Sequence, residues 1–487
     1  MTHLQKKIAL ISVFASVCII TFVVLTVNDV FKKIVEDQIK EHTKLKLNSE
    51  VYKNWKEPPV PAYMQFFFFN IENPEEILQG KQARVVEVGP YIYKELRNRS
   101  NVLMFDNATI SAVTQKSFVF QRNMSVGDPK KDFITTVNIP FVAMLQSLKS
   151  GGMAQKLILS FLFVLKNSMI FQSLSVEELL WGYEDPLLKL GQKLLPSNFP
   201  DSRFGLFYGA NGSDDGLYLF NTGKKNYMDF TKIIMWNGQK SLSWWASNTS
   251  NMINGTDGST FHPLINKDEA LYIFAPDICR SLNVVFEKEV QVKGIDAYRF
   301  TVPREIFEMD NLKKEGFCPM RNCCLTGVLD ISICKKGVPI IISSPHFYNG
   351  DQKLVNDIEG MKPDAITHQT FLDLEPMTGV PIRAAKRMQL NIRIEAMDYV
   401  VQTSRIRTMI MPVVFLNENA VIDNKLAVKL RKVLHTMKVV TYIPYIILWI
   451  GILLFLITLV LLFFMCMYRE KKEYTPVSVK LPNIKAH

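Results

Sequence analysis

The last long apolar run of the chain, Tyr442–Met467, constrains the fold more than any other stretch. No charged residue falls between Lys438 and Arg469, and the centre of the run is almost wholly Leu, Ile, Val and Phe. A bilayer core of roughly 30 Å needs about 20 apolar residues in a helix, so this run is long enough to cross one. We therefore predict a transmembrane helix over residues 439–468.

A second apolar run, Ile8–Val27, lies near the other end and also contains no charged residue. A cleaved signal peptide has a shorter apolar core and a small-residue cleavage site, which this run lacks at its end. We predict an uncleaved signal anchor over residues 8–27. Two spans leave residues 28–438 as one large loop on a single side of the membrane, with tails 1–7 and 469–487 on the other side.

The side on which this loop lies does not follow from lysine counts, because long loops translocate largely regardless of charge. Its clustered cysteines are typical of disulfides in a translocated domain, and they lack the Cys-x-x-Cys or His pairs of a metal site. All six Asn-x-Ser/Thr sequons also lie in the loop. We therefore predict a lumenal or extracellular loop. The predicted glycosylation sites are Asn98, Asn107, Asn123, Asn211, Asn248 and Asn254.

Composition limits the class of function. Charged residues make up 21% of the chain and hydrophobic residues 48%, as expected for a folded domain with two spans. The net charge of +11 is scattered and the domain is predicted to be translocated, so anionic lipid or lipoprotein surfaces fit better than nucleic acid. No hydrolase, metalloprotease or phosphate-loop motif occurs, and His262, His346 and His368 are more typical of packed histidines. We predict neither enzyme activity nor a cofactor.

Periodicity along the loop alternates between strand-like and helical stretches. Asn28–Leu47 predicts an amphipathic helix and Ala62–Asn70 an aromatic-rich strand. Residues 139–195 have apolar positions at helical spacing, and Ser175-Val-Glu-Glu is typical of a helix cap, so we expect about three packed helices there. The fold class is therefore α+β, with a largely antiparallel sheet or barrel. Further predicted strands are Arg84–Tyr93, Ile110–Gln121, Phe204–Tyr208, Gly216–Phe220, Leu271–Phe274, Leu282–Val290, Tyr298–Val302, Val338–Ser343 and Met388–Arg393.

The segment Leu157–Leu165 within the helical region is apolar on every face. Nine residues are too few to span a bilayer, so the segment is either buried or presented to a partner. Two interpretations stay open: a bundle that only packs against itself, or a docking surface with an apolar centre and a lysine rim. The candidate docking residues are Lys149, Lys156, Leu157, Phe161, Leu165 and Lys166.

Several short motifs of the loop resemble those of the class B scavenger receptors and stand in the same order. They are Asn73-Pro-Glu-Glu-Ile-Leu, Arg84-Val-Val-Glu-Val-Gly-Pro-Tyr, Glu178-Leu-Leu-Trp-Gly-Tyr, Asn251-Met-Ile-Asn-Gly-Thr-Asp-Gly, Ile278-Cys-Arg-Ser, Gly327-Val-Leu-Asp-Ile-Ser-Ile-Cys and Ser344-Pro-His-Phe. The sequence looks most like the lysosomal branch at Ser125-Val-Gly-Asp-Pro, Thr260-Phe-His-Pro-Leu-Ile and Ile443-Pro-Tyr-Ile-Ile. The resemblance implies a β-barrel ectodomain, an apical helical bundle and an internal tunnel that leads lipid towards the membrane.

The resemblance also implies two disulfides in the cysteine cluster. One joins Cys279 to Cys334, and a second, short one starts at Cys318. This sequence departs from the family pattern, since it has adjacent cysteines there and one residue fewer between Cys318 and Cys323. Counting back from Cys334 favours Cys323 as the partner, whereas counting forward from Cys318 favours Cys324. Both partners stay open.

Two functions follow from the resemblance. In the first, the protein is a lipid receptor that takes cholesterol, phospholipid or fatty acid at the apex and passes it through a tunnel to the membrane. In the second, it is a cargo receptor that binds lysosomal β-glucocerebrosidase through the apical helices. Lipoproteins and a second copy of the chain are further candidate partners. No histidine lies between His42 and His262, so a histidine-based release at acidic pH cannot lie in these helices.

The C-terminal tail bears on the location of the protein. The lysosomal branch carries a dileucine sorting signal after acidic residues, and this tail lacks one. The sequence from Tyr474 to Val477 fits a tyrosine-based sorting signal instead. We predict a lysosomal or late endosomal membrane protein with both termini cytosolic, or a plasma-membrane protein if the tail signal is inert.

Overall fold

The computed structural model describes residues 3–147, 152, 160, 163, 168–194, 201–318, 325–397, 400 and 402–473. The chain forms two compact units, which are described separately. The first consists of Met1–Glu41 and Val428–His487, and the second of His42–Ala427. The helices are α1 (His3–Val27), α2 (Val30–His42), α3 (Glu50–Lys56), α4 (Pro74–Leu78), α5 (Ile139–Ser147), α7 (Val176–Trp181), α8 (Pro186–Leu194), α9 (Met309–Glu315), α10 (Gln352–Asn356), α11 (Ala365–His368), α12 (Asn424–Thr441) and α13 (Ile443–Glu473).

Two long helices dominate the first unit. Both α1 and α13 contain stretches long and apolar enough to cross a membrane, Gln5–Val27 and Ile443–Arg469. The first includes the predicted span 8–27, whereas the predicted span 439–468 begins four residues too early, because residues 439–441 still belong to α12. The two helices α1 and α13 pack together through small residues, because Ala15 and Cys18 of α1 are buried and Gly451 of α13 lies against them. A Cβ on Gly451 would lie 3.0 Å from the Cβ of Cys18, so glycine permits this close approach.

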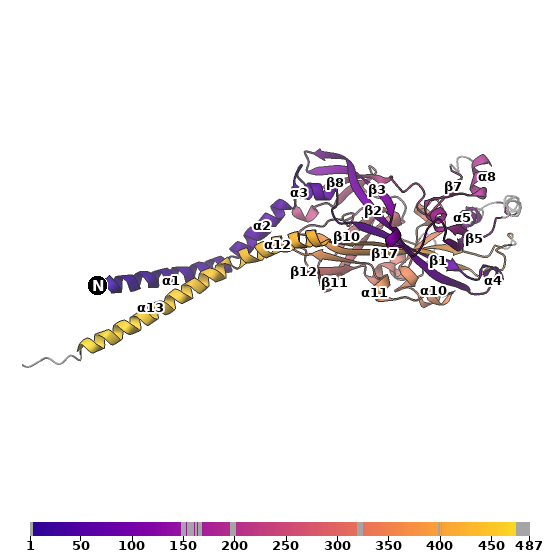
Figure 1. Cartoon of the computed structure of the whole chain (residues 1–487). Helices are drawn as coiled ribbons and strands as arrows, with labels where there is room; N and C mark the ends of the chain where they lie inside the picture. The colour runs from indigo at the N-terminus through magenta and orange to yellow at the C-terminus, as the bar shows by residue number, and fades with distance from the viewer. Residues whose placement is uncertain are drawn as a thin grey trace, which may run out of the picture. The chain divides into compact units, whose positions relative to one another are not determined.

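A large, mainly antiparallel sheet forms the second unit (Figure 1). Its strand order is β10-β11-β12-β16-β17-β18-β1-β2-β3-β8-β9, with β14 paired to β17 and β13 to β14. Among the described strands, β15 alone pairs in parallel, with β2. The strands are β1 (Ala62–Ile71), β2 (Ala83–Phe105), β3 (Thr109–Phe120), β4 (Phe133–Val137), β5 (Phe171–Ser175), β6 (Tyr183–Glu184), β7 (Arg203–Phe204), β8 (Asp214–Asn221), β9 (Ile233–Trp236), β10 (Leu271–Ala275), β11 (Arg280–Val292), β12 (Ile295–Thr301), β13 (Val328–Asp330), β14 (Ile340–Ser343), β15 (Ile358–Glu359), β16 (Phe371–Glu375), β17 (Val380–Ile394) and β18 (Met409–Val421).

A short segment at Gly255 and Thr256 connects the two ends of this sheet. The Ile233 N–H of β9 donates to the Gly255 carbonyl at 2.8 Å, and the Thr256 N–H donates to the Tyr272 carbonyl of β10 at 3.1 Å. Gly255 has a φ of +86°, and a Cβ there would clash with the Tyr272 carbonyl, so the approach requires glycine. The sheet is thus a nearly closed barrel, which confirms the predicted α+β fold with an antiparallel barrel.

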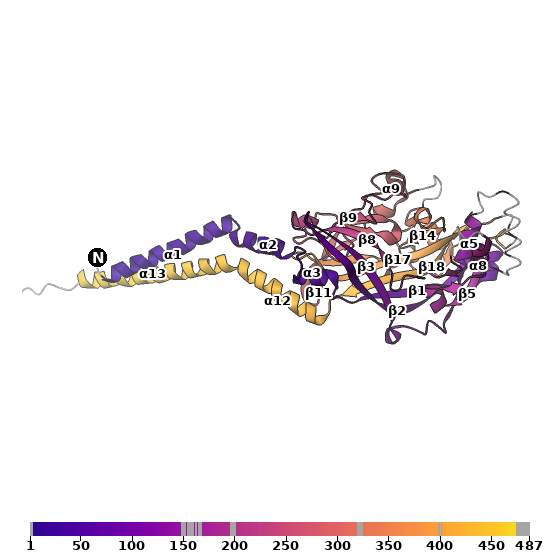
Figure 2. The ribbon, with the colours of Figure 1, turned by 90° about the horizontal axis from the view of Figure 1, so that it is seen from above.

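The aromatic strand β1 lies at the centre of the core. It pairs with β18 on one side and β2 on the other, and Figure 2 shows β1, β17 and β18 running side by side. The side chains of Phe66, Phe68 and Phe69 are fully buried. β2 continues through Gly89-Pro90, because a register shift between Phe66 and Phe68 of β1 accommodates that pair within the ladder.

The helical region matches the sequence prediction in part. Helices α5, α7 and α8 are present, and the predicted cap is confirmed: the Ser175 hydroxyl accepts the Glu178 N–H while the Glu178 carboxylate accepts the Ser175 N–H. Between α5 and α7, however, β5 pairs with β4, which the sequence did not predict. In both views α5, α8 and β5 lie together at one end of the barrel (Figures 1 and 2).

The predicted strand Phe204–Tyr208 is wrong beyond its first residue. β7 ends at Phe204, and the following residues turn, with the Tyr208 N–H donating to the Gly205 carbonyl at 3.2 Å. The turn forms because Gly205 packs closely on the backbone of Gly182, where a Cβ would lie 2.6 Å from the Gly182 nitrogen. An extended strand would lose this contact.

Candidate functional site

The barrel encloses a cavity of about 250 Å³, which we call the barrel cavity. Its walls come from β2, β3, β8, β10, β11, β14, β16, β17 and β18, so it is surrounded by strands. This volume lies below the roughly 300–1,000 Å³ of typical ligand pockets. The described residues therefore form a local cavity, and the through-going lipid tunnel stays a prediction. One part of the wall is apolar and includes Ile273, Phe274, Leu282, Val284, Ile342, Leu372 and Met388.

The other part of the wall carries ion-paired side chains. Arg97 of β2 donates to Glu95 at 2.7 Å and also to Glu418 of β18. Lys386 of β17 lies 3.0 Å from Asp277 and 3.8 Å from Glu418. Carboxylates and cations thus alternate along one face of the cavity, contributed by segments far apart in the sequence.

These ion pairs fix the charge of that face. Burial favours a higher pKa for Glu418, but Arg97 and Lys386 outweigh it and lower that pKa to about 2. Lys386 likewise holds the pKa of Asp277 well below its usual range. The Lys386 side chain is 39% exposed although strands of the barrel surround it, because its exposed surface faces the cavity. The face therefore stays charged from mildly acidic to neutral pH.

Arg99 holds another part of the cavity wall and is only 4% exposed. Its guanidinium lies 4.6 Å from the ring centre of Trp55 and donates to the Trp55 carbonyl, to Asp257 and, at 3.0 Å, to the Ser259 hydroxyl. Burial favours a higher pKa for Asp257, but Arg99 outweighs it and the pKa is lowered. Arg99 thereby ties α3 and the loop at residues 257–259 to β2.

Together the two parts make the barrel cavity amphipathic. An apolar wall removes hydrocarbon from water, which stabilises binding by about 25 cal/mol for each Å² of apolar surface buried. The charged face offers hydrogen bonds to a polar group at one end of the same molecule. The arrangement thus suits a molecule with both an apolar and a polar part.

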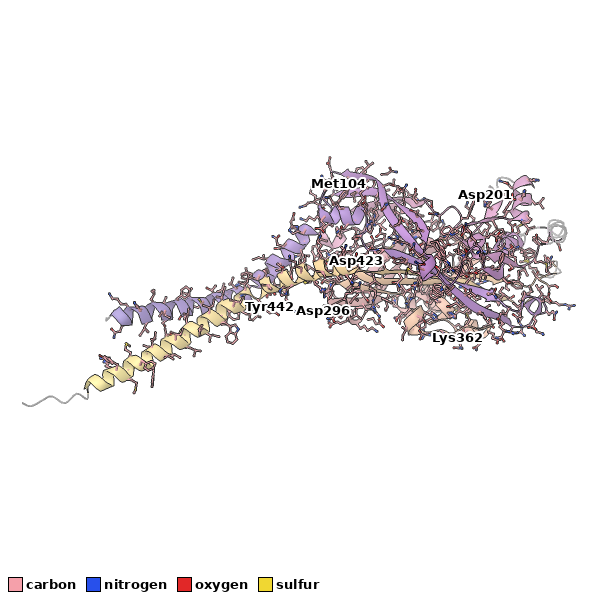
Figure 3. The ribbon with its side chains drawn as sticks, viewed as in Figure 1. Met104, Asp201, Asp296, Lys362, Asp423 and Tyr442 are labelled. Carbon is pink, nitrogen blue, oxygen red and sulfur yellow. A yellow bond between two sulfur atoms is a disulfide. The ribbon has the colours of Figure 1, made fainter. Side chains whose placement is uncertain are left out.

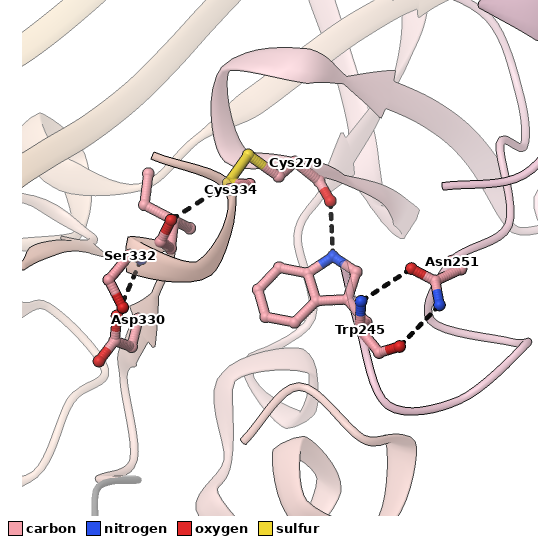
Figure 4. Close-up of a disulfide and its surroundings, with 7 residues drawn as sticks. Trp245, Asn251, Cys279, Asp330, Ser332 and Cys334 are labelled. Atoms are coloured by element: carbon pink, nitrogen blue, oxygen red, sulfur yellow. Dashed lines mark hydrogen bonds between the residues drawn. A yellow bond between two sulfur atoms is a disulfide. The ribbon is translucent and has the colours of Figure 1, made fainter. Parts of the chain in front are cut away.

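The expected disulfide between Cys279 and Cys334 is present, 55 residues apart in the sequence. Figure 4 shows how its surroundings are held: the Trp245 indole N–H donates to the Cys279 carbonyl at 2.7 Å. The amide of Asn251 accepts the Trp245 N–H at 2.9 Å and donates to the Trp245 carbonyl at 2.7 Å. The bridge therefore ties the residue before β11 to the segment that precedes β14, and the Trp245 hydrogen bond attaches a buried tryptophan loop at the same place.

Cys318 is disulfide-bonded too. Both candidate partners, Cys323 and Cys324, lie outside the described residues, so the choice between them stays a prediction.

The predicted glycosylation sites differ in exposure. Asn98, Asn107, Asn123, Asn211 and Asn248 are exposed, and Asn254 is half-buried beside the segment that closes the barrel. Their occupancy stays a prediction.

The candidate docking residues Lys149, Lys156, Leu157, Phe161, Leu165 and Lys166 lie outside the described residues, as do Tyr474 and Val477 of the sorting signal. Two residues within the apolar segment, Ser160 and Phe163, are described. Phe163 is fully buried, and its ring centre lies 4.2 Å from that of Phe141. At least this residue packs into the core, so its side chain is not offered to a partner.

A pair of stacked, buried histidines lies against β1, β2 and β18, and no sequence pattern predicted it. The ring centres of His346 and His368 are 4.6 Å apart. His346 Nε2 lies 2.6 Å from Glu87, while Nδ1 accepts the Lys362 N–H; His368 Nδ1 accepts the Asp364 N–H. Burial, together with His346, lowers the pKa of His368 to about 4.

Two candidate membrane spans and a barrel with an amphipathic cavity fit a membrane protein that binds an amphipathic molecule. The CD36 family model matches residues 13–462. Lysosome membrane protein 2 of Rattus norvegicus is 47% identical over 436 residues, which cover 89% of this chain and 90% of the relative, and that of Homo sapiens is 46% identical with the same coverage. Scavenger receptor class B member 1 of Sus scrofa is 34% identical over 431 residues, covering 88% and 84%. This chain belongs to the CD36 family.

Proposed function

We propose that this membrane receptor takes a lipid, such as cholesterol, a phospholipid or a fatty acid, into the barrel cavity and passes it towards the membrane. The observation that carries this proposal is the amphipathic barrel cavity, with its apolar wall opposite an ion-paired face. Relatives named as scavenger receptors and as lysosome membrane proteins support a receptor of the lysosomal or late endosomal membrane. Plasma-membrane residence is the alternative location.

The proposed topology places both termini in the cytosol and residues 28–438 in the lumen or outside the cell. The disulfide between Cys279 and Cys334 supports this side, since disulfides persist in oxidising compartments. Both ends of the ectodomain are then anchored in one membrane.

Filling the barrel cavity tests the lipid function. Ala420 of β18 lines the cavity opposite Ala384 of β17, whereas the neighbouring Val421 is 37% exposed and points to the other face of the strand. We expect Ala420→Phe to reduce the lipid that co-purifies with the full-length protein at least fivefold, and Val421→Phe to leave it unchanged. Equal lipid content in the two folded variants would contradict the proposal.

A second candidate function is transport of lysosomal β-glucocerebrosidase as protein cargo. The 47% identity to lysosome membrane protein 2 and the helices α5 and α8 at one end of the barrel support it. We expect a pull-down with the enzyme to succeed at neutral and at acidic pH alike, and to fail after Lys156→Glu with Lys166→Glu. Absence of binding at both pH values would leave the lipid function alone.

A further inference from the structure

A second cavity, of about 570 Å³, shares no lining residue with the barrel cavity. It lies where β2 and β3 meet α7 and the turn at residues 207–211, and we call it the aromatic pocket. Its ring-bearing residues are Tyr93, Phe118, Phe120, Trp181, Phe207 and Tyr208. Six aromatic rings around one hollow form an uncommon wall, because rings of this size are normally packed without leaving space.

The rings of the aromatic pocket hold one another in place. The ring centres of Tyr93 and Trp181 are 5.2 Å apart, and the Trp181 indole N–H donates to the Tyr93 hydroxyl at 3.2 Å. Phe207 packs edge-on against Phe118 at 5.9 Å. The Tyr208 hydroxyl donates to the Asp201 carboxylate at 2.9 Å, which holds the ring in place. Asp201 lies at the same end of the barrel as α8 (Figure 3). A wall held in this way is formed before any ligand arrives.

The charges at this pocket are unbalanced. Asp128 and Glu177 line it with one cation, Lys130. Within the part of the chain that the structure describes, neither the Glu177 carboxylate nor the Lys130 ammonium group makes a hydrogen bond or an ion pair. Burial raises the pKa of Tyr93 to about 12, and the carboxylates of Glu177 and Asp128 add to that rise. The interior of the pocket is therefore electrostatically negative.

We propose that the aromatic pocket binds the quaternary ammonium group of a phosphocholine headgroup. Aromatic faces attract such a cation through the negative charge density of their π-electrons. Glu177 and Asp128 supply the opposite charge, and Lys130 can meet the phosphate of the same headgroup. A neutral apolar ligand would gain nothing from the carboxylates, and a simple anion would be repelled by them. This proposal rests on the proposed lipid function and adds to it the recognition of one headgroup. The aromatic pocket that would bind the headgroup is separate from the barrel cavity.

Calorimetry on the full-length protein, in a detergent without a choline group, tests the role of charge. The probes are phosphocholine, choline and 3,3-dimethylbutan-1-ol, which has the shape of choline without its charge. We expect phosphocholine and choline to bind and the neutral alcohol to bind at least tenfold more weakly. Equal affinity for choline and its neutral analogue would overturn the proposal, as would no binding of phosphocholine.

Matched variants then assign the site. Glu177→Gln should weaken choline binding about tenfold, whereas Glu184→Gln, which alters an exposed carboxylate paired with Lys189 outside the pocket, should leave it unchanged. Tyr208→Leu, at a ring that is 41% exposed, provides a second test if Glu177→Gln fails to fold. Unchanged affinity in a folded Glu177→Gln or Tyr208→Leu protein would overturn the assignment.

Three further comparisons test the phosphate contact, the source of the headgroup and the independence of the two proposals. Lys130→Met should weaken phosphocholine but not choline, and dihexanoylphosphatidylcholine should bind at least fivefold more tightly than phosphocholine if the natural ligand is a lipid. Equal affinity for dihexanoylphosphatidylcholine and phosphocholine would contradict the inference that the natural ligand is a lipid. Ala420→Phe should leave phosphocholine affinity unchanged, so a failure of the barrel proposal is distinguishable from a failure of this one.

Discussion

The barrel cavity and the aromatic pocket use charge in opposite ways. In the barrel, every one of these cations has a carboxylate partner: Arg97 and Lys386 share Glu418, and Arg99 is bound by Asp257. At the aromatic pocket, the Glu177 carboxylate has no such partner among the described residues. Paired charges hold strands together and give a polar surface of fixed charge, whereas an unpaired charge beside aromatic rings is available to a ligand. The two sites therefore predict different consequences when a charge is removed.

The largest expected effect comes from Arg99. Arg99→Met leaves Asp257 largely buried without its cation, which costs about 3–5 kcal/mol of the free energy of unfolding. Chemical denaturation of the purified protein measures this loss. Glu177→Gln should change the free energy of unfolding by less than about 0.5 kcal/mol, because Glu177 has no described partner to lose. Similar losses in both variants would remove the distinction between the two sites.

The histidine pair, His346 and His368, predicts a pH dependence of stability that the ion pairs of the barrel do not share. Because the pKa of His368 is about 4 in the folded protein and about 6.5 when unfolded, the folded state binds fewer protons between these values. The stability that this provides is present above about pH 6.5 and is lost as pH falls towards 4, by roughly 3 kcal/mol at most.

Unfolding midpoints at pH 7 and pH 4.5 measure this dependence. The groups that face the ring are His346, Glu87, Asp364 and Arg387, and the ion pairs of the barrel stay charged over this range. His368→Gln should therefore flatten the pH dependence. An unchanged slope in that variant would show that another group is responsible.

The smallest expected effect concerns the helix that carries Glu177 and Trp181. Ser175→Ala removes the cap of α7 and costs about 1 kcal/mol of stability, because the Glu178 N–H loses its acceptor. We expect phosphocholine affinity to fall a few-fold while the lipid content of the barrel stays constant. Ser173→Ala, at an exposed position of β5, is the matched control. A parallel loss of barrel lipid would mean that the two sites are coupled.

Much of the fold follows from patterns within single stretches of sequence. Apolar length predicted the helices at Ile8–Val27 and Tyr442–Met467, and a run of aromatic residues predicted β1. The central strand β18 was not predicted. All of its first nine residues are buried, so it lacks the apolar–polar alternation of a half-exposed strand.

The sites were harder to predict, since each is assembled from distant segments. Arg97 and Lys386 look like solvent-facing positions of strands, because alternation cannot distinguish an internal cavity from bulk water. Tyr93, Trp181 and Phe207 come together only after β2, α7 and the turn that follows β7 have packed. No spacing between them in the sequence indicates a pocket.

The closing segment at Gly255 and Thr256 has a consequence for self-association. A strand at the edge of a sheet offers unpaired N–H and C=O groups to any passing chain, which is how sheets recruit further copies and aggregate. Here such groups of the edge strands β9 and β10, at Ile233, Tyr272 and Phe274, form hydrogen bonds with Gly255 and Thr256. Substitution of Gly255 would separate the two edges and expose these groups. A single glycine thus keeps both edges of the barrel paired within the chain instead of open to a second copy.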